Sequence, residues 1–370
     1  MIDSGAKMGG PVDPKEIERW LSTMPGRDAI PFSAMPAELY GVRQLYEGYS
    51  PDDPDSLEKA FDTKIYNWTR DASGSETRVL ELPETIATRL HDTAIDRLVA
   101  AFLDAPHSRT IGFMGGHGIL RTAVTFRRIA EIARELRRRG FLIVTGGGPG
   151  LMEAANLGAF MAPFDDKDLT KAIGTLRAVP DYRSTKDWIR TAATARADLL
   201  GNWDADAPAG SRNLGIPTWV YGFEPPNLFA TSVAKYFYNS LREDGLVSVA
   251  NGGLVFGKGD AGTVQEVFQN AVLNYYRKKT TAPTPMVFYD IDFWNPSPET
   301  DAAAGAPLDS HRKPVFPLIR KLATEAQEPF DAALMLSNDP DNIVEFLSSA
   351  NTVKAPTLVR AADLVSLKMT

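Results

Sequence analysis

The chain has 370 residues, a formal net charge of -7 and no cysteine. This length predicts one large domain or two smaller ones, and the absence of cysteine excludes disulfides, thiolate metal sites and a cysteine nucleophile, so we expect a reducing, cytoplasmic setting. The acidic balance argues against a nucleic-acid partner, and no apolar run approaches the roughly 20 residues that cross a bilayer, so no membrane partner is expected either. With only four scattered histidines, the sequence does not predict a metal site.

Residues 1–105 predict a mainly helical N-terminal extension. Prolines interrupt its first half, and a helix is expected at about 83–105, where apolar residues approximate one face. We find no residues there that suggest chemistry. The extension is therefore expected to pack on the core or on a second subunit.

Residues 106–352 predict a Rossmann-like domain, an α/β fold with a doubly wound parallel sheet. The expected strands cover 111–114, 141–144, 173–179, 217–221, 254–256, 286–289 and 333–336. Helices are expected between and after them, at 124–140, 186–200, 227 to about 242, 263–276, 315–323 and 341–350. Repeated alternation of strands and helices specifies this architecture. Residues 353–370 would form a C-terminal tail.

Glycine-rich turns follow the first two of these strands. The first turn carries Gly115, Gly116 and His117, and it matches the dinucleotide fingerprint only in part, because Arg121 stands where a glycine is required. NAD is therefore disfavoured. His117 is either a ligand contact or incidental.

The second glycine-rich turn contains Gly146, Gly147, Gly148 and Gly150, and a helix follows it at once. Backbone N–H groups at the start of a helix favour a phosphate. The alternative is a tight turn that packs against the helix and binds no ligand.

A further glycine loop, Gly257 to Thr263, precedes a strongly amphipathic helix that carries Glu266. Glu266 is a candidate catalytic carboxylate, but Thr263 and Glu266 also have the spacing of a capping box, which would give both a structural role. Asp260 would bind a sugar hydroxyl or stabilise the turn. Arg242 is predicted at the end of the preceding helix, where the helix dipole alone would favour a cation.

Two motifs resemble one family, the Lonely Guy type of phosphoribohydrolases together with the related nucleotide 5'-monophosphate nucleosidases. Residues 146–154 look like the family's GGGPGLMEA, and residues 258–266 look like its PGGxGTxxE. The similarity extends from about Arg109 to Ala350. Lys258 replaces the family's proline and Asp260 its second glycine.

The resemblance implies hydrolysis of the N-glycosidic bond of a nucleoside 5'-monophosphate, without a metal or cofactor, in a homodimer or larger assembly. It implies Glu266 and Arg242 as catalytic residues. The substrate-binding residues that it implies are Gly115, Gly116, Gly146, Gly147, Gly148, Met152, Glu153, Gly259, Asp260, Ala261, Gly262 and Thr263. Because of Lys258 and Asp260, a nucleotide-binding sensor or carrier that does not hydrolyse its ligand stays open as the alternative.

Overall fold

Seven parallel strands form a single sheet in the order β4-β3-β2-β1-β5-β6-β7. The computed structural model describes residues 30–350 apart from residue 75 and the ranges 104–108, 221–223 and 298–311, together with residues 15, 16, 19 and 23. The tail predicted at 353–370 lies outside the described residues.

The strands are β1 Thr110–Met114, β2 Leu142–Thr145, β3 Asn213–Gly215, β4 Ser232–Val233, β5 Gly253–Phe256, β6 Met286–Tyr289 and β7 Leu334–Ser337. Strands β1, β2, β5 and β6 are buried along their whole length, as their continuous apolar sequences require.

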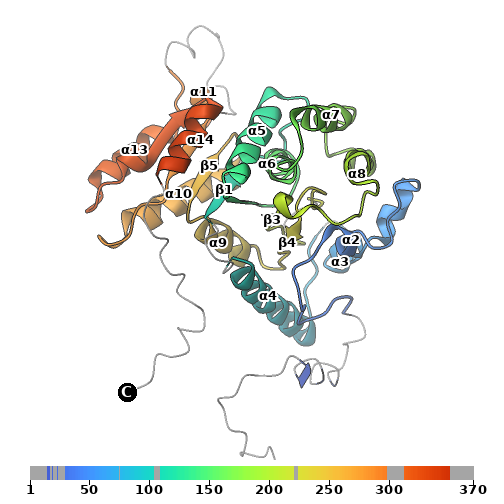
Figure 1. The fold of residues 1–370 in the computed structure, drawn as a ribbon. Coiled ribbons are helices and arrows are strands. Elements are labelled where there is room, and N and C mark those ends of the chain that lie inside the picture. Colours follow the sequence, from blue (N-terminus) through green and yellow to red (C-terminus); the bar gives the residue numbers. More distant parts are fainter. Residues whose placement is uncertain are drawn as a thin grey trace, which may run out of the picture.

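Helices cover both faces of the sheet. The chain runs from β1 to β2 and β3 in one direction and from β5 to β6 and β7 in the other, so right-handed crossovers place the connecting helices on opposite faces. Figure 1 shows α5 and α6 on one side of β1 and α9 on the other. One layer contains α5 Val124–Arg138, α6 Leu151–Phe160 and α14 Pro340–Ser349, and the other contains α9 Asn239–Val249, α10 Ala261–Tyr275 and α13 Phe316–Glu325. The predicted doubly wound α/β fold is confirmed.

Further helices complete the domain. They are α7 Asp166–Leu176, α8 Thr185–Leu200, α11 Ile291–Trp294, and the 3-10 helices η3 Ala209–Ser211 and η4 Asp331–Ala333. No helix in the described ranges combines the length and apolar character that crossing a bilayer requires.

The described part of the N-terminal extension is helical and packs on the β4 side of the domain (Figure 1). It contains α2 Val42–Leu45, η2 Pro54–Lys59, α3 Phe61–Trp68 and α4 Leu82–Leu103, the last of which corresponds to the predicted helix at 83–105. Tyr40 forms an antiparallel bridge with Val233 of β4. Asp92 of α4 is fully buried and accepts hydrogen bonds from the backbone N–H groups of Phe237 (3.0 Å) and Tyr238 (2.9 Å). Buried polar contacts therefore fix the extension to the core.

Between residues 165 and 245 the helix predicted at 186–200 is confirmed as α8 Thr185–Leu200, but the other predicted elements are wrong. The strand expected at 173–179 is occupied by the end of α7, which starts with a capping box between Asp165 and Asp168. β3 at Asn213–Gly215 was missed, and the described residues of the range 217–221 form no strand. The helix expected from residue 227 is replaced by β4 and then by α9, which begins only at Asn239.

Candidate active site at the carboxyl ends of β1, β2 and β5

The loops after β1, β2 and β5 meet at one edge of the sheet. Strand β1 lies between β2 and β5. The strands that follow β2 extend the sheet on one side of β1, and those that follow β5 extend it on the other. Open α/β sheets bind ligands at such a reversal of strand order. Gly116 donates its N–H to the carbonyl of Lys258 at 2.7 Å, and Leu151 donates to the carbonyl of Gly116 at 3.2 Å. Gly150 has φ +70°, and a Cβ atom there would lie 2.5 Å from the carbonyl oxygens of Gly116 and His117. Only glycine permits this close contact between the first two loops.

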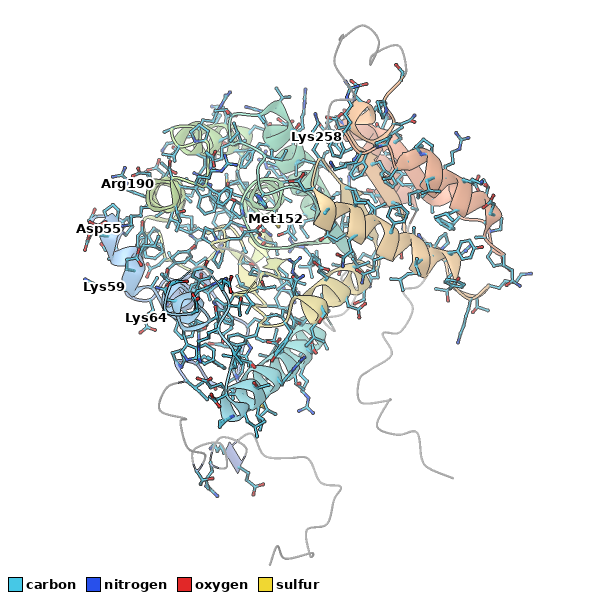
Figure 2. The ribbon with its side chains drawn as sticks, turned by 180° about the vertical axis from the view of Figure 1, so that it is seen from behind. Asp55, Lys59, Lys64, Met152, Arg190 and Lys258 are labelled. Carbon is cyan, nitrogen blue, oxygen red and sulfur yellow. The ribbon has the colours of Figure 1, made fainter. Side chains whose placement is uncertain are left out.

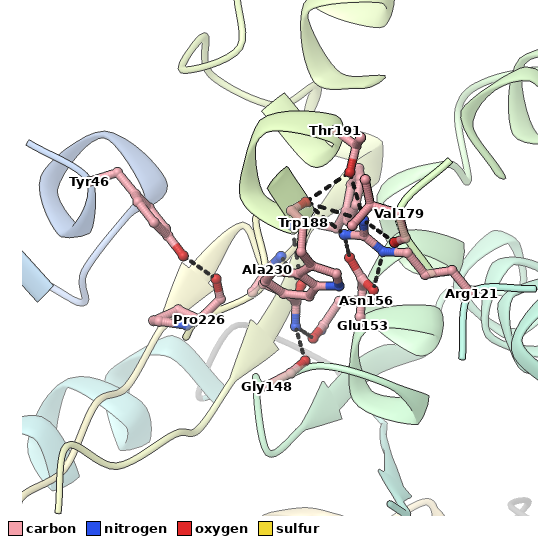
Figure 3. A network of polar contacts seen from close by, with 12 residues as sticks. Tyr46, Arg121, Gly148, Glu153, Asn156, Val179, Trp188, Thr191, Pro226 and Ala230 are labelled. Carbon is pink, nitrogen blue, oxygen red and sulfur yellow. Dashed lines mark hydrogen bonds and ion pairs between the residues drawn. The ribbon is translucent and has the colours of Figure 1, made fainter. Parts of the chain in front are cut away.

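The glycine loop after β2 is held by hydrogen bonds within the protein. Thr145 accepts the N–H of Gly147 at 2.8 Å, and Asn227 donates its backbone N–H to the carbonyl of Gly147 at 2.9 Å. The side chain of Asn227 also donates to the carbonyl of Gly148 at 3.0 Å, a contact within the network of Figure 3. The loop is thus fixed without a ligand.

Packing alone accounts for several of its glycines. A Cβ atom at Gly147 would lie 2.9 Å from Pro217, and one at Gly148 would lie 3.0 Å from Met152 and 3.1 Å from the carboxylate of Glu224. The packing alternative drawn from the sequence is therefore sufficient to explain the glycine pattern. The case for a ligand depends on the side chains around the loop.

Arg242 and Glu266 bring the two motifs together. Their Nη1 and Oε1 atoms are 3.9 Å apart, and a Cβ atom at Gly146 would also lie 3.9 Å from Arg242 Nη1. The guanidinium group thus lies between the glycine loop and Glu266. Its Nε atom is buried and has no hydrogen-bond partner among the described residues, so the group keeps an unused donor at this position.

Both structural alternatives for this pair are wrong. Helix α10 begins at Ala261 and has no side-chain cap, so Thr263 is not its N-cap, and Glu266 lies in its second turn outside any capping box. Arg242 lies near the beginning of α9, not at its end, where the helix dipole disfavours a cation. Neither position is explained by the requirements of its own helix.

The carboxyl group of Glu266 has an unusual environment. Its residue is only 8% exposed, and burial raises its pKa from 4.5 to about 7. The charge of Arg242 acts in the opposite direction, while the nearby carboxylates of Glu243 and Glu224 raise the pKa further. Perturbed carboxyl groups of this kind are concentrated at functional sites.

His117 and Glu224 form a second pair of titratable side chains beside Gly148. His117 Nδ1 lies 2.8 Å from Glu224 Oε1, and this hydrogen bond raises the pKa of His117. The edge of the His117 ring contacts Tyr182, with centroids 5.5 Å apart. The sequence offered no signal for Glu224, which lies in an irregular segment between β3 and β4 and outside both motifs.

The structure corrects the role predicted for Glu153 as a substrate contact. Glu153 is fully buried, and both of its carboxylate oxygens accept hydrogen bonds from Arg121, with Nε–Oε2 at 2.9 Å (Figure 3). Arg121 also donates to Thr191 and contacts the ring of Trp188. The carboxylate of Glu153 is therefore a structural partner of Arg121 and is not available to a substrate.

The other predicted binding residues surround the three loops. Gly115 packs against Leu151, and Met152 is nearly buried under Gly146, where an added Cβ atom would lie 2.6 Å from its sulfur. The hydroxyl of Thr263 lies directly under Gly259, where it leaves no room for a Cβ atom. The exposed residues at the beginning of α10 are Asp260, Ala261 and Gly262.

A cavity of about 390 Å³ adjoins the loops after β1, β5 and β6. Lys258 forms an ion pair with Asp290 at 2.9 Å, and Asp290 is the one non-glycine residue with positive φ (85°) in the described part of the chain. Figure 2 shows Met152 near the middle of the molecule and Lys258 toward the C-terminal helices. Arg242 and Glu266 do not line this cavity. Its lining residues are Gly116, Gly118, Ile119, Lys258, Gly259, Asp260, Asp290, Asp292, Phe293 and Arg312.

Comparisons with known proteins do not assign the chain to a family. No protein-family model matches it, and no curated protein matches it. Among solved structures it is similar to the molybdenum cofactor binding protein from the phototrophic bacterium Rippkaea orientalis, with 13% identity and a TM-score of 0.36, covering 67% of this chain and 100% of that chain. A similarity at this level carries no argument about function, which has to come from the residues of the site.

Proposed function

We propose that the protein hydrolyses the N-glycosidic bond of a nucleoside 5'-monophosphate and releases a free base and ribose 5-phosphate. The observation that carries the proposal is the Arg242–Glu266 pair, 3.9 Å apart and next to Gly146. A buried carboxyl group, a guanidinium group and a fixed glycine loop beside β1, where the order of the strands reverses, suit a small anionic ligand.

In this mechanism Glu266 acts on the sugar. Cleavage of the glycosidic bond develops oxocarbenium-like positive charge on the ribose, which a fixed carboxylate can stabilise while it orients the attacking water. Burial makes that interaction stronger than it would be in water, because the effective dielectric constant is lower. Arg242 would hold the substrate or stabilise negative charge on the leaving side.

A nucleotide-binding sensor or carrier is the second candidate. The observations that favour it are the low exposure of Glu266 (8%) and the presence of further carboxylates, Glu224 and Asp260, near the glycine loops. Incubating the purified protein with AMP, CMP, GMP and UMP, with chromatographic detection of free base, separates the candidates. Base release supports the hydrolase. Calorimetrically detected binding with no base release supports the sensor.

Base release is expected to increase with pH, with a midpoint near pH 7. The ionised form of Glu266 is the one that stabilises positive charge, and its pKa is about 7. Arg242→Met is expected to move this midpoint upward, because the charge of Arg242 lowers that pKa. The measurement is kcat/KM for base release between pH 5 and pH 9 at constant ionic strength. A rate that falls through pH 7 would instead mean that Glu266 acts as a protonated acid.

A further inference from the structure

Val220 and Pro226, which lie on either side of Glu224 in the sequence, both accept hydrogen bonds from the N-terminal extension. Arg70 Nη2 donates to the carbonyl oxygen of Val220 at 3.1 Å, and Tyr46 Oη donates to the carbonyl oxygen of Pro226 at 2.6 Å. Arg70 and Tyr46 both precede the part of the chain that forms the sheet. The N-terminal extension thus bonds to Pro226, two positions after Glu224, whose side chain lies near Gly148.

Tyr46 is only one peptide group away from that loop. The carbonyl of Pro226 accepts the Tyr46 hydroxyl, and the N–H of the same peptide group, on Asn227, donates to the carbonyl of Gly147 at 2.9 Å. Hydrogen bonds in such a chain polarise one another. Figure 3 shows the Tyr46–Pro226 bond in the same view as the contacts at Gly148.

The Tyr46 hydroxyl is well suited to act as a lasting hydrogen-bond donor to the Pro226 carbonyl. The residue is 2% exposed, and burial raises its pKa well above the ordinary value, so the hydroxyl keeps its proton and remains a donor. Because the contact is buried, the loss of this donor leaves the carbonyl of Pro226 with one partner fewer and little access to water.

We propose that the N-terminal extension is a positioning element for the nucleotide site, acting through Tyr46 on the Pro226–Asn227 peptide group and through Arg70 on the carbonyl of Val220. The identity of the ligand rests on the proposed function. The hydrogen bonds that connect the N-terminal extension to the glycine loop do not depend on that function. Neither residue contacts the reacting atoms in this scheme, so both are positioning residues.

Tyr49 provides a matched control. It lies three positions after Tyr46, its ring contacts the Tyr46 ring edge-on with centroids 6.0 Å apart, and its hydroxyl is buried with no hydrogen-bond partner among the described residues. Tyr46→Phe and Tyr49→Phe remove the same atom from neighbouring side chains. Only the first change breaks a bond to the Pro226 carbonyl.

The test compares both variants of the full chain with the wild type at a temperature well below every melting midpoint. Tyr46→Phe is expected to bind AMP about tenfold more weakly in titration calorimetry, because one buried acceptor loses its donor. It should also exchange backbone amides faster in the stretches 146–150 and 227–230. Tyr49→Phe should match the wild type in both measurements.

Equal effects of the two variants, or no effect of Tyr46→Phe on amide exchange, would overturn the proposal. Should Tyr46→Phe fail to fold, Arg70→Met makes the same test by removing the bond to the Val220 carbonyl, with the exposed change Lys64→Met as its control. Failure of the proposed function is a separate result. A wild-type protein that binds no nucleoside monophosphate removes the ligand measurement, and amide exchange still decides whether the extension holds the loop.

Discussion

A Glu266→Gln variant is expected to release base about a thousandfold more slowly than the wild type while its nucleotide affinity changes little. Glutamine keeps the size and hydrogen-bonding shape of the side chain but carries no negative charge, and removing one preorganised electrostatic group from an active site typically costs 10²–10³ in rate. The measurement is single-turnover base release with saturating AMP, together with calorimetric binding at the same pH.

Glu135→Gln, an exposed change on α5, is the control for that experiment and should leave the rate unchanged. If Glu266→Gln binds AMP as the wild type does and also releases base at the wild-type rate, Glu266 is not a catalytic residue. If neither protein releases base, the sensor becomes the better explanation.

The same substitution is expected to stabilise the protein above pH 7. The pKa of Glu266 is raised from 4.5 to about 7, so its favourable contribution to folding is complete below about pH 4.5 and is lost as the pH rises through 7. At pH 8 the buried charge costs about 3 kcal/mol on an order-of-magnitude basis, and glutamine avoids that cost. Urea denaturation at pH 8 and pH 5 should show a clear gain for Glu266→Gln at pH 8 and almost none at pH 5. A gain of the same size at both pH values would contradict the assigned pKa.

Glu153→Gln is expected to have the largest effect on stability, a loss of about 3–5 kcal/mol. The substitution leaves Arg121, which is 1% exposed, without a counter-charge in the interior. The free energy of unfolding in urea measures the loss. Glu131→Gln, which breaks only the exposed pairs with Arg127 and Arg128, should cost less than about 1 kcal/mol. Similar losses in the two variants would show that the buried pair contributes no more than a surface pair.

The sequence predicted the parts of the fold whose signals are local. Strands β1, β2, β5 and β6 are continuous apolar runs, and α10 shows a clear helical period, so both were assigned close to their observed bounds. The region around β3 and β4 was not predictable in this way. β3 contains Asn213, which is buried and accepts a hydrogen bond from Asn156 of α6 at 2.8 Å. A short strand with a buried polar residue has no continuous apolar run, so the sequence pattern does not predict it.

The residues of the candidate site also fall into those that the sequence could indicate and those that it could not. Glu266 and Arg242 were predicted as site residues because they stand in or near a recognisable motif, and the structure places their side chains 3.9 Å apart. Glu224 could not be found, since its position depends on the Gly148 backbone and on His117, which come from other loops. Glu153 was misassigned for the opposite reason. It belongs to the motif, but its partner Arg121 comes from a different part of the chain, and the sequence does not show that the two meet.

The bridge between Tyr40 and Val233 has a consequence for solubility. β4 is the outermost strand on its side of the sheet, and the two hydrogen bonds exchanged with Tyr40, at 3.0 and 2.8 Å, occupy backbone groups that would otherwise face solvent. An uncovered terminal strand is a template for pairing with other chains. We therefore expect truncation before Val42 to expose the backbone groups of Val233 and to increase self-association of the folded chain.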